Sequence, residues 1–297
     1  MPAGHKRHNH LMPFLAVAAG IASFSVMDGL MKSASLAIGA YSAMLWRSAA
    51  GVVLMAPAWK LRGGTMPQAA LLRLHALRGA NTAGMAVSFF YGITKLPLAE
   101  GIAISFIAPL IALYLAAILL GEWVARRAVL ASLLGLSGVI VICAARLGEG
   151  GYDRDAVLGI AAILFSAALY AWNLILQRQQ AQIADPVEIA LFQAVFTGLA
   201  LLPFAPWFGH LLPVAQWSAI ALSAVLAMLS LMLIAWGYAR AETQVLLPME
   251  YTAFLWAAVT GWVMFGEALT PATVAGAVLI VVGCWIAARG HTEQTAL

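Results

Sequence analysis

The chain has 297 residues, of which 63% are hydrophobic and only 9% are charged, with a formal net charge of +4 and a mean hydropathy of +0.92. An average soluble domain carries about 25% charged residues, so this composition excludes an ordinary soluble fold, intrinsic disorder and a nucleic-acid-binding protein. It indicates an integral membrane protein, whose basic net charge reflects Lys and Arg in cytoplasmic loops.

Ten mostly apolar runs follow one another along the chain, each near the length of about 20 residues that a helix needs to cross a bilayer. The connections between the runs are short, so we expect a single helical bundle. A membrane barrel would instead show alternating strands of about 10 residues. The expected spans are 12–32, 40–59, 74–93, 98–119, 128–146, 156–177, 187–208, 215–238, 244–265 and 271–289.

The distribution of Lys and Arg predicts how these spans are oriented. The first run lacks a convincing cleavage site and is expected to remain as an uncleaved span. Most basic residues then lie on the side of the N-terminus, which predicts an inner-membrane protein with both termini in the cytoplasm. The inner side holds Lys6, Arg7, Lys60, Arg62, Arg73, Arg78, Arg126, Arg127, Arg178, Arg240 and Arg289, whereas the outer side holds Lys32, Lys95, Arg146 and Arg154.

The two halves of the chain form an internal repeat. One constant shift places Gly92 on Gly237 and Asp28 on Asn173, and one residue of slip places Arg47 over Gln193. Each half has five spans, an odd number, so the second half enters the membrane from the opposite side, as in many secondary transporters. The expected organisation is a cytoplasmic tail (1–11), the first five-helix repeat (12–146), a periplasmic connector (147–155), the inverted second repeat (156–289) and a cytoplasmic tail (290–297).

Two segments at corresponding places carry a specific resemblance. SFIAPLIALYLAAILLGEW (105–123) and EYTAFLWAAVTGWVMFGEALTP (250–271) each end an apolar helix in Gly-Glu. They resemble the fourth and ninth helices of the drug/metabolite transporter superfamily, in particular its ten-helix EamA-type members. The resemblance implies ten helices in two inverted halves around a central cavity, and transport of a small metabolite or drug, usually as export. Within that group the chain looks most like the bacterial exporters of aromatic and other amino acids.

The charged residues deepest in the predicted spans are Asp28 and Arg47. An ionisable group within a span suggests a functional site, because its exposure to lipid is costly. Helix geometry places the two residues at nearly the same depth, where they form either a structural ion pair or part of a substrate site. Their repeat counterparts, Asn173 and Gln193, are expected at the mirrored depth near the cytoplasm, where amides can hydrogen-bond a zwitterion.

Several aromatic and hydroxyl residues are further candidates for the substrate path. Tyr91 and Trp236 are repeat partners that either gate the two mouths of a cavity or belong to the interfacial belt. Trp46, Tyr170, Trp172 and Tyr251 either line an aromatic cavity or pack between helices. The Ser88 hydroxyl either faces the path or bonds its own helix backbone.

Acidic and proline residues complete the set of candidates. Glu250 is a possible proton carrier, with snorkelling toward the cytoplasm as the alternative. Glu122 and Glu267, which follow a glycine at corresponding places in the two repeats, are interpreted as structural connectors. After Glu267, Thr270 and Pro271 are expected to start the next helix. Pro109 is expected to kink its helix.

These features favour a secondary transporter that exports small metabolites, most of all aromatic and other apolar amino acids, by alternating access. A multidrug transporter, or one for other metabolites such as nucleosides or sugars, is the alternative within the same fold. An intramembrane enzyme is less favoured because the chain has no HExxH or GxSxG motif, and a membrane scaffold because it would not explain Asp28 and Arg47 inside the membrane. The chain also has no GxxxxGK[ST] motif, so it is not expected to use ATP directly. We expect no catalytic residue, cofactor or metal. The expected partners are the substrate and the lipid bilayer, with no nucleic acid, and protons take part if transport is proton antiport rather than simple facilitation.

Overall fold

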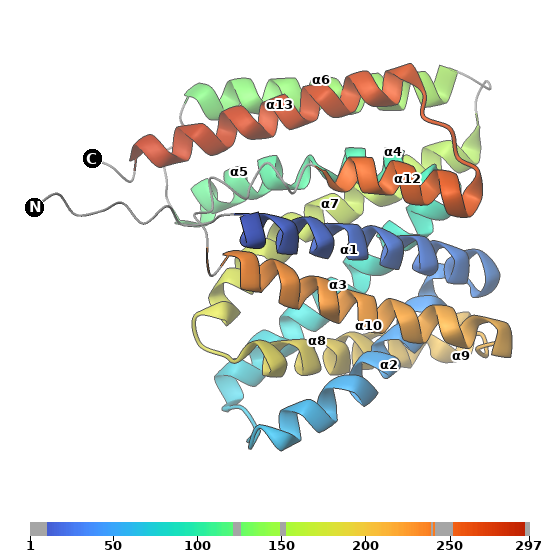
Figure 1. The fold of residues 1–297 in the computed structure, drawn as a ribbon, viewed down its shortest axis with the longest axis vertical. Coiled ribbons are helices and arrows are strands. Elements are labelled where there is room, and N and C mark those ends of the chain that lie inside the picture. Colours follow the sequence, from blue (N-terminus) through green and yellow to red (C-terminus); the bar gives the residue numbers. More distant parts are fainter. Residues whose placement is uncertain (1–10, 121–125, 149–152, 239, 241–251, 295–297) are drawn as a thin grey trace, which may run out of the picture.

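The computed structural model describes residues 11–120, 126–148, 153–238, 240 and 252–294, and within these residues it is all-helical, as the sequence predicts (Figure 1). The first half contains α1 (Leu11–Ile38), α2 (Ala40–Leu61), α3 (Ala69–Lys95), α4 (Leu98–Ser105), α5 (Ala108–Leu120) and α6 (Arg126–Gly148). The second half contains α7 (Arg154–Ala181), α8 (Pro186–Leu201), the 3-10 turn η1 (Leu202–Phe204), α9 (Ala205–Phe208), α10 (Val214–Tyr238), α12 (Ala253–Phe265) and α13 (Pro271–Gln294).

Local sequence signals set where the helices begin and end. Gly39 separates α1 from α2 with a φ of 80°, a conformation that favours glycine because a Cβ is disfavoured there. The Asp185 side chain caps α8 by accepting a hydrogen bond from the Val187 amide, directly before Pro186 at the first helical position. Thr270 caps α13 in the same way through the Thr273 amide, as expected from the sequence.

Pro109 lies next to a break in the predicted span 98–119. The span is divided into α4, which ends at Ser105, and α5, which begins at Ala108. Proline has no backbone N–H, so the carbonyl four residues earlier, that of Ser105, loses its helical hydrogen bond. The Ser105 hydroxyl bonds the Gly101 carbonyl at 2.8 Å. The sequence predicted a kink at this point, and the structure has an interruption of two residues.

The helices pack as pairs that join the first half of the chain to the second. α1 packs against α10, α3 against α7, α2 against α8 and α6 against α13. Figure 1 shows α6 and α13 side by side along one edge of the bundle, with α2 near the opposite edge. Small residues allow the closest approaches: a Cβ added at Gly138 of α6 would lie 2.5 Å from the Gly276 carbonyl oxygen of α13.

The outer surface of the bundle is suited to lipid. Large apolar side chains are highly exposed on many helices, including Val53 at 72%, Ile118 at 81% and Trp262 at 68%. In water such a surface would drive association. Among the described residues, four helical stretches are long and apolar enough to cross a membrane: Met12–Ile38, Arg154–Gln177, Pro186–Phe208 and Val214–Gly237.

The contact between α6 and α13 gives a first prediction. We expect Gly138→Ala to lower the midpoint of thermal unfolding in detergent, because the new methyl group would meet backbone and Ile280 at 2.5 to 2.6 Å. The matched control is Gly198→Ala in α8, whose Cβ would only touch Ser48 at an ordinary 3.5 Å. Both substitutions gain up to about 1 kcal/mol of helix propensity, so the control should be neutral or stabilising. Equal midpoints for the two variants would contradict this packing argument.

Candidate functional site

Asp28 of α1 and Arg47 of α2 lie in a common environment inside the bundle. Both side chains are partly buried, and each lies close enough to affect the other electrostatically. The Arg47 guanidinium donates to the Met27 sulfur at 3.2 Å and lies over the Phe90 ring, 5.7 Å from its centroid, within the range of a cation–π interaction. The ion pairs within 4 Å found in the described part of the chain do not include Asp28 with Arg47.

Asn173 of α7 and Gln193 of α8 meet through a third residue, Thr82 of α3. The Gln193 amide nitrogen lies 3.5 Å from the Thr82 hydroxyl, which lies 3.5 Å from the Asn173 side-chain oxygen. The same oxygen accepts a shorter hydrogen bond of 3.1 Å from Nε of Arg78. The two amides that the repeat pairs with Asp28 and Arg47 therefore belong to one polar cluster at the junction of α3, α7 and α8.

Arg78 continues this cluster toward the end of the bundle. Its Nη1 donates to the Gln180 side-chain oxygen at 2.6 Å, and the Gln180 nitrogen lies 3.0 Å from Nδ1 of His75. Nε2 of His75 lies 3.3 Å from the Glu188 carboxylate, and the imidazole ring stacks on Phe192. Arg78, His75 and Gln180 are each 5% exposed or less. The inner polar network, as we call Thr82, Asn173, Gln193, Arg78, Gln180, His75 and Glu188, is thus largely enclosed.

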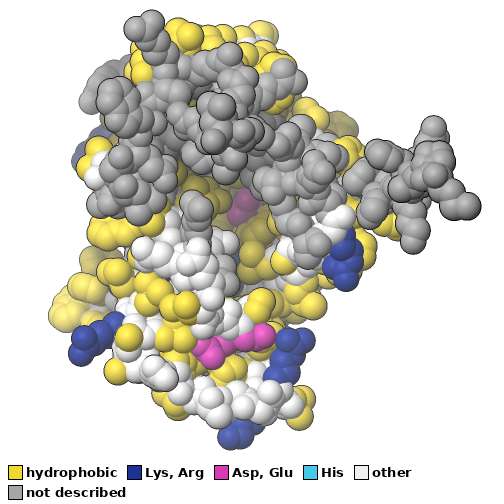
Figure 2. All heavy atoms as spheres, turned by 90° about the vertical axis from the view of Figure 1, so that its left-hand side faces the viewer, with side chains coloured by type: hydrophobic (Ala, Val, Ile, Leu, Met, Phe, Trp, Pro, Cys, Tyr) yellow, Lys and Arg dark blue, Asp and Glu magenta, His cyan; other side chains and the backbone are white. Residues whose placement is uncertain are grey.

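The sequence counted Arg78 among the basic residues of the inner side, and the structure shows that its side chain is buried in the bundle. Arg78 lies within α3 and is 5% exposed. The residue already fell inside the predicted span 74–93, which was the available signal. Figure 2 looks onto this end of the bundle and shows basic and acidic side chains gathered there, flanked by hydrophobic ones.

Lys32 was likewise expected on the outer surface and is instead 4% exposed. Its ammonium group forms an ion pair with Glu267 and donates to the Leu96 carbonyl at 2.8 Å. The second carboxylate oxygen of Glu267 accepts a 2.6 Å hydrogen bond from the Leu98 amide, at the start of α4. This geometry fits the interpretation of Glu267 as a structural connector, since it joins α1, α4 and the end of α12.

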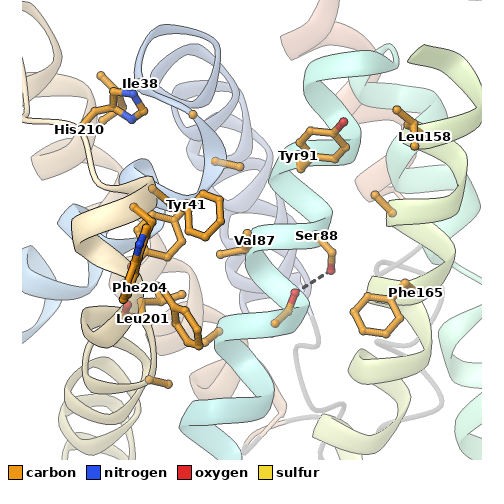
Figure 3. Close-up of a pocket in the computed structure, with 18 of the residues that line it drawn as sticks. Ile38, Tyr41, Val87, Ser88, Tyr91, Leu158, Phe165, Leu201, Phe204 and His210 are labelled. Atoms are coloured by element: carbon orange, nitrogen blue, oxygen red, sulfur yellow. Dashed lines mark hydrogen bonds between the residues drawn. The ribbon is translucent and has the colours of Figure 1, made fainter. Parts of the chain in front are cut away.

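A groove of about 1,020 Å³ lies at the other end of α3. Figure 3 shows Ser88 and Tyr91 on α3, with Phe165 of α7 on one side and Tyr41 and Phe204 on the other. The Ser88 hydroxyl bonds the Gly84 carbonyl of its own helix at 2.7 Å, which is the alternative considered from the sequence. The groove has a mainly apolar lining that suits a lipid chain or an apolar substrate group.

The remaining candidates are dispersed. The Trp46 indole donates to the His210 carbonyl at 3.1 Å, which ties α2 to the segment before α10. Tyr170, Trp172 and Trp236 are exposed, and the Arg240 guanidinium lies 4.3 Å from the Trp236 ring. Glu122, Glu250 and Tyr251 lie outside the described residues. Within the described part of the chain, no group of three or more His, Cys, Asp or Glu could hold a metal ion.

The Lys32–Glu267 pair gives a second prediction. Glu267→Gln should lower the free energy of unfolding by about 3 to 5 kcal/mol, because it removes the carboxylate that forms an ion pair with the buried Lys32 ammonium group. Lys32→Met added to Glu267→Gln should restore much of the loss. Unfolding midpoints in detergent measure both effects.

The matched control is Asp155→Asn, which changes a carboxylate to an amide in an exposed pair. Asp155 accepts a hydrogen bond from Lys95 at 2.9 Å, and this bond raises the pKa of Lys95. Because an exposed pair contributes about 0 to 1 kcal/mol, Asp155→Asn should change the midpoint little. An effect of Glu267→Gln no larger than that of Asp155→Asn would refute the structural role.

Comparisons with known proteins extend over nearly the whole chain. The EamA-like transporter family matches residues 11–144 and 157–289, one stretch in each half. The pseudopaline exporter CntI of Pseudomonas aeruginosa strain UCBPP-PA14 is 26% identical over 91% of this chain and 93% of its own length. An uncharacterized transporter of Helicobacter pylori strain J99 is 27% identical over 59% of each chain. One solved protein crystal structure shares the fold, with a TM-score of 0.63, 21% identity and coverage of 93% of this chain and 96% of its own.

Proposed function

The chain belongs to the EamA-like transporter family, and from this premise we propose that it is a secondary transporter that exports a small metabolite by alternating access. It is an integral membrane protein of a transporter family rather than of an enzyme family. The cargo we propose is an amino acid, with aromatic and other apolar ones first.

Ten spans in two inverted repeats are the architecture that we propose. The separate family matches to residues 11–144 and 157–289 support it. The helix packing supports it as well, because the repeat relates α1 to α7 and α3 to α10. A two-fold operation that exchanges the halves would therefore convert the α1–α10 contact into the α7–α3 contact, and both are present.

The orientation that we propose has both termini in the cytoplasm of the inner membrane. Burial of Lys32 and Arg78 removes one basic residue from each side of the charge comparison. The remaining Lys and Arg still lie mostly on the side of the N-terminus, so the positive-inside argument keeps its direction.

The observation that carries the transport proposal is the placement of two polar groups at different levels along α3. Arg47 packs on Phe90 with Asp28 nearby, whereas Arg78 and Thr82 hold Asn173 and Gln193 at the other end. Arg78 and Phe90 are about 18 Å apart along the helix at 1.5 Å per residue. A zwitterionic cargo can therefore bind polar groups at two depths, one in each half of its path.

Export of another metabolite is the second candidate. It is supported by the 26% identity to the pseudopaline exporter over 91% of the chain. Counterflow into proteoliposomes separates the candidates, with labelled amino acids, nucleosides, sugars and drugs tested with and without a pH gradient. Absence of counterflow for every amino acid would contradict the cargo that we propose, and absence for all compounds would contradict transport itself.

Asp28 gives the third prediction. Asp28→Asn should reduce counterflow of the transported compound about tenfold or more, because a hydrogen bond or ion pair to a charged group contributes about 1.5 to 3 kcal/mol. The variant should still assemble, since an amide occupies nearly the same volume. The control is Asp155→Asn, the same change at an exposed carboxylate. Wild-type flux in Asp28→Asn would rule out a role for this carboxylate in transport.

A further inference from the structure

Arg78 is a buried cation whose hydrogen-bond partners are neutral. It is 5% exposed, and the described residues bonded to it are the amides of Asn173 and Gln180. No carboxylate in the described part of the chain forms an ion pair with it. A guanidinium has five N–H donors, and these two hydrogen bonds use only two of them. Burial of a charge without a counter-charge is costly.

The direction of the hydrogen bonds in the inner polar network follows from Arg78. Arginine can only donate, so the oxygen of Gln180 faces Arg78 and its nitrogen faces His75. His75 therefore accepts at Nδ1, which leaves its proton on Nε2, directed at the Glu188 carboxylate. Glu188 is thus two neutral groups away from Arg78. Its carboxylate lies against His75 and does not contact the guanidinium.

We infer that Arg78 is the binding site for a carboxylate group of the transported molecule, held in place by Asn173 and Gln180. This inference rests on the proposed transport function and names the chemical class of its cargo. A planar guanidinium binds a carboxylate through two parallel hydrogen bonds. The N–H groups of Arg78 that are not bonded to Asn173 or Gln180 can form these two bonds. Because Arg78 is enclosed, the cargo reaches it only when α3, α7 and α8 move apart, as alternating access requires.

Lys32 provides the internal comparison. It is buried to the same degree, but its charge is compensated within the protein by Glu267. A permanent counter-ion fits a purely structural cation, whereas amide partners leave the charge of Arg78 available to an anion from outside. The two residues therefore differ in partner chemistry rather than in burial.

The test compares L-phenylalanine with L-phenylalaninamide, which lacks the carboxylate, by titration calorimetry on the purified chain. The wild type should bind phenylalanine about tenfold or more tightly than the amide, as expected for a charge-assisted contact. Gln180→Glu should abolish this difference, because it places a built-in carboxylate against Arg78 at nearly constant volume. The control Gln179→Glu adds the same charge to an exposed position of α7 and should keep the difference.

Arg78→Gln and Arg78→Lys complete the test at the guanidinium itself. Arg78→Gln should remove the preference for the carboxylate, and Arg78→Lys should retain part of it, since the charge stays but the planar fork is lost. Equal binding of the two compounds by the wild type, binding of neither, or a preference that persists in Gln180→Glu would overturn the inference. Counterflow is measured separately, so a preference without any counterflow would refute transport and leave the carboxylate site standing.

Discussion

A charge inside an apolar bundle has to be compensated by polar groups of the protein, because neither lipid nor packed apolar side chains can replace water. This constraint accounts for the arrangement of the interior polar groups. Lys32 obtains a carboxylate from Glu267 and a backbone carbonyl from Leu96. Arg78 obtains two amide oxygens, and Arg47 obtains a sulfur, an aromatic face and the field of Asp28.

The contacts that compensate these charges lie where the two halves of the chain meet. Lys32 belongs to the first half and Glu267 to the second, and Arg78 likewise reaches Asn173 and Gln180 across the division. The outward faces keep their large apolar side chains. Because the halves are joined by polar groups inside and close glycine contacts between paired helices, a rearrangement of one half against the other has to exchange these specific bonds. That makes the interior networks the natural elements to change during transport.

The sequence predicts where the helices lie, but it does not predict which residues the buried polar side chains contact. Apolar runs of the right length predicted an all-helical chain, and Pro109 marked where one run is interrupted. The repeat singled out Asn173 and Gln193, which the structure places in one network with Thr82. Lys32 and Arg78 were counted with the basic residues of the two membrane sides, because a basic residue near the end of a span can either snorkel to the interface or turn inward. For Arg78 the packing of α3 against α7 and α8 decides between those outcomes, and for Lys32 the contacts with Glu267 and Leu96 decide.

On the proposed path the two polar groups differ in the charges that they present to a cargo. Asp28 and Arg47 present opposite charges close together, so both ends of a zwitterion have a partner there. At the inner polar network the cationic Arg78 is bordered by amides, and the carboxylate of Glu188 lies beyond Gln180 and His75. A cargo bound there is held by its carboxylate, while its ammonium group meets only dipoles. On this proposed path the ammonium group gains a charged partner only where it reaches Asp28, so the two polar groups would bind the same cargo differently.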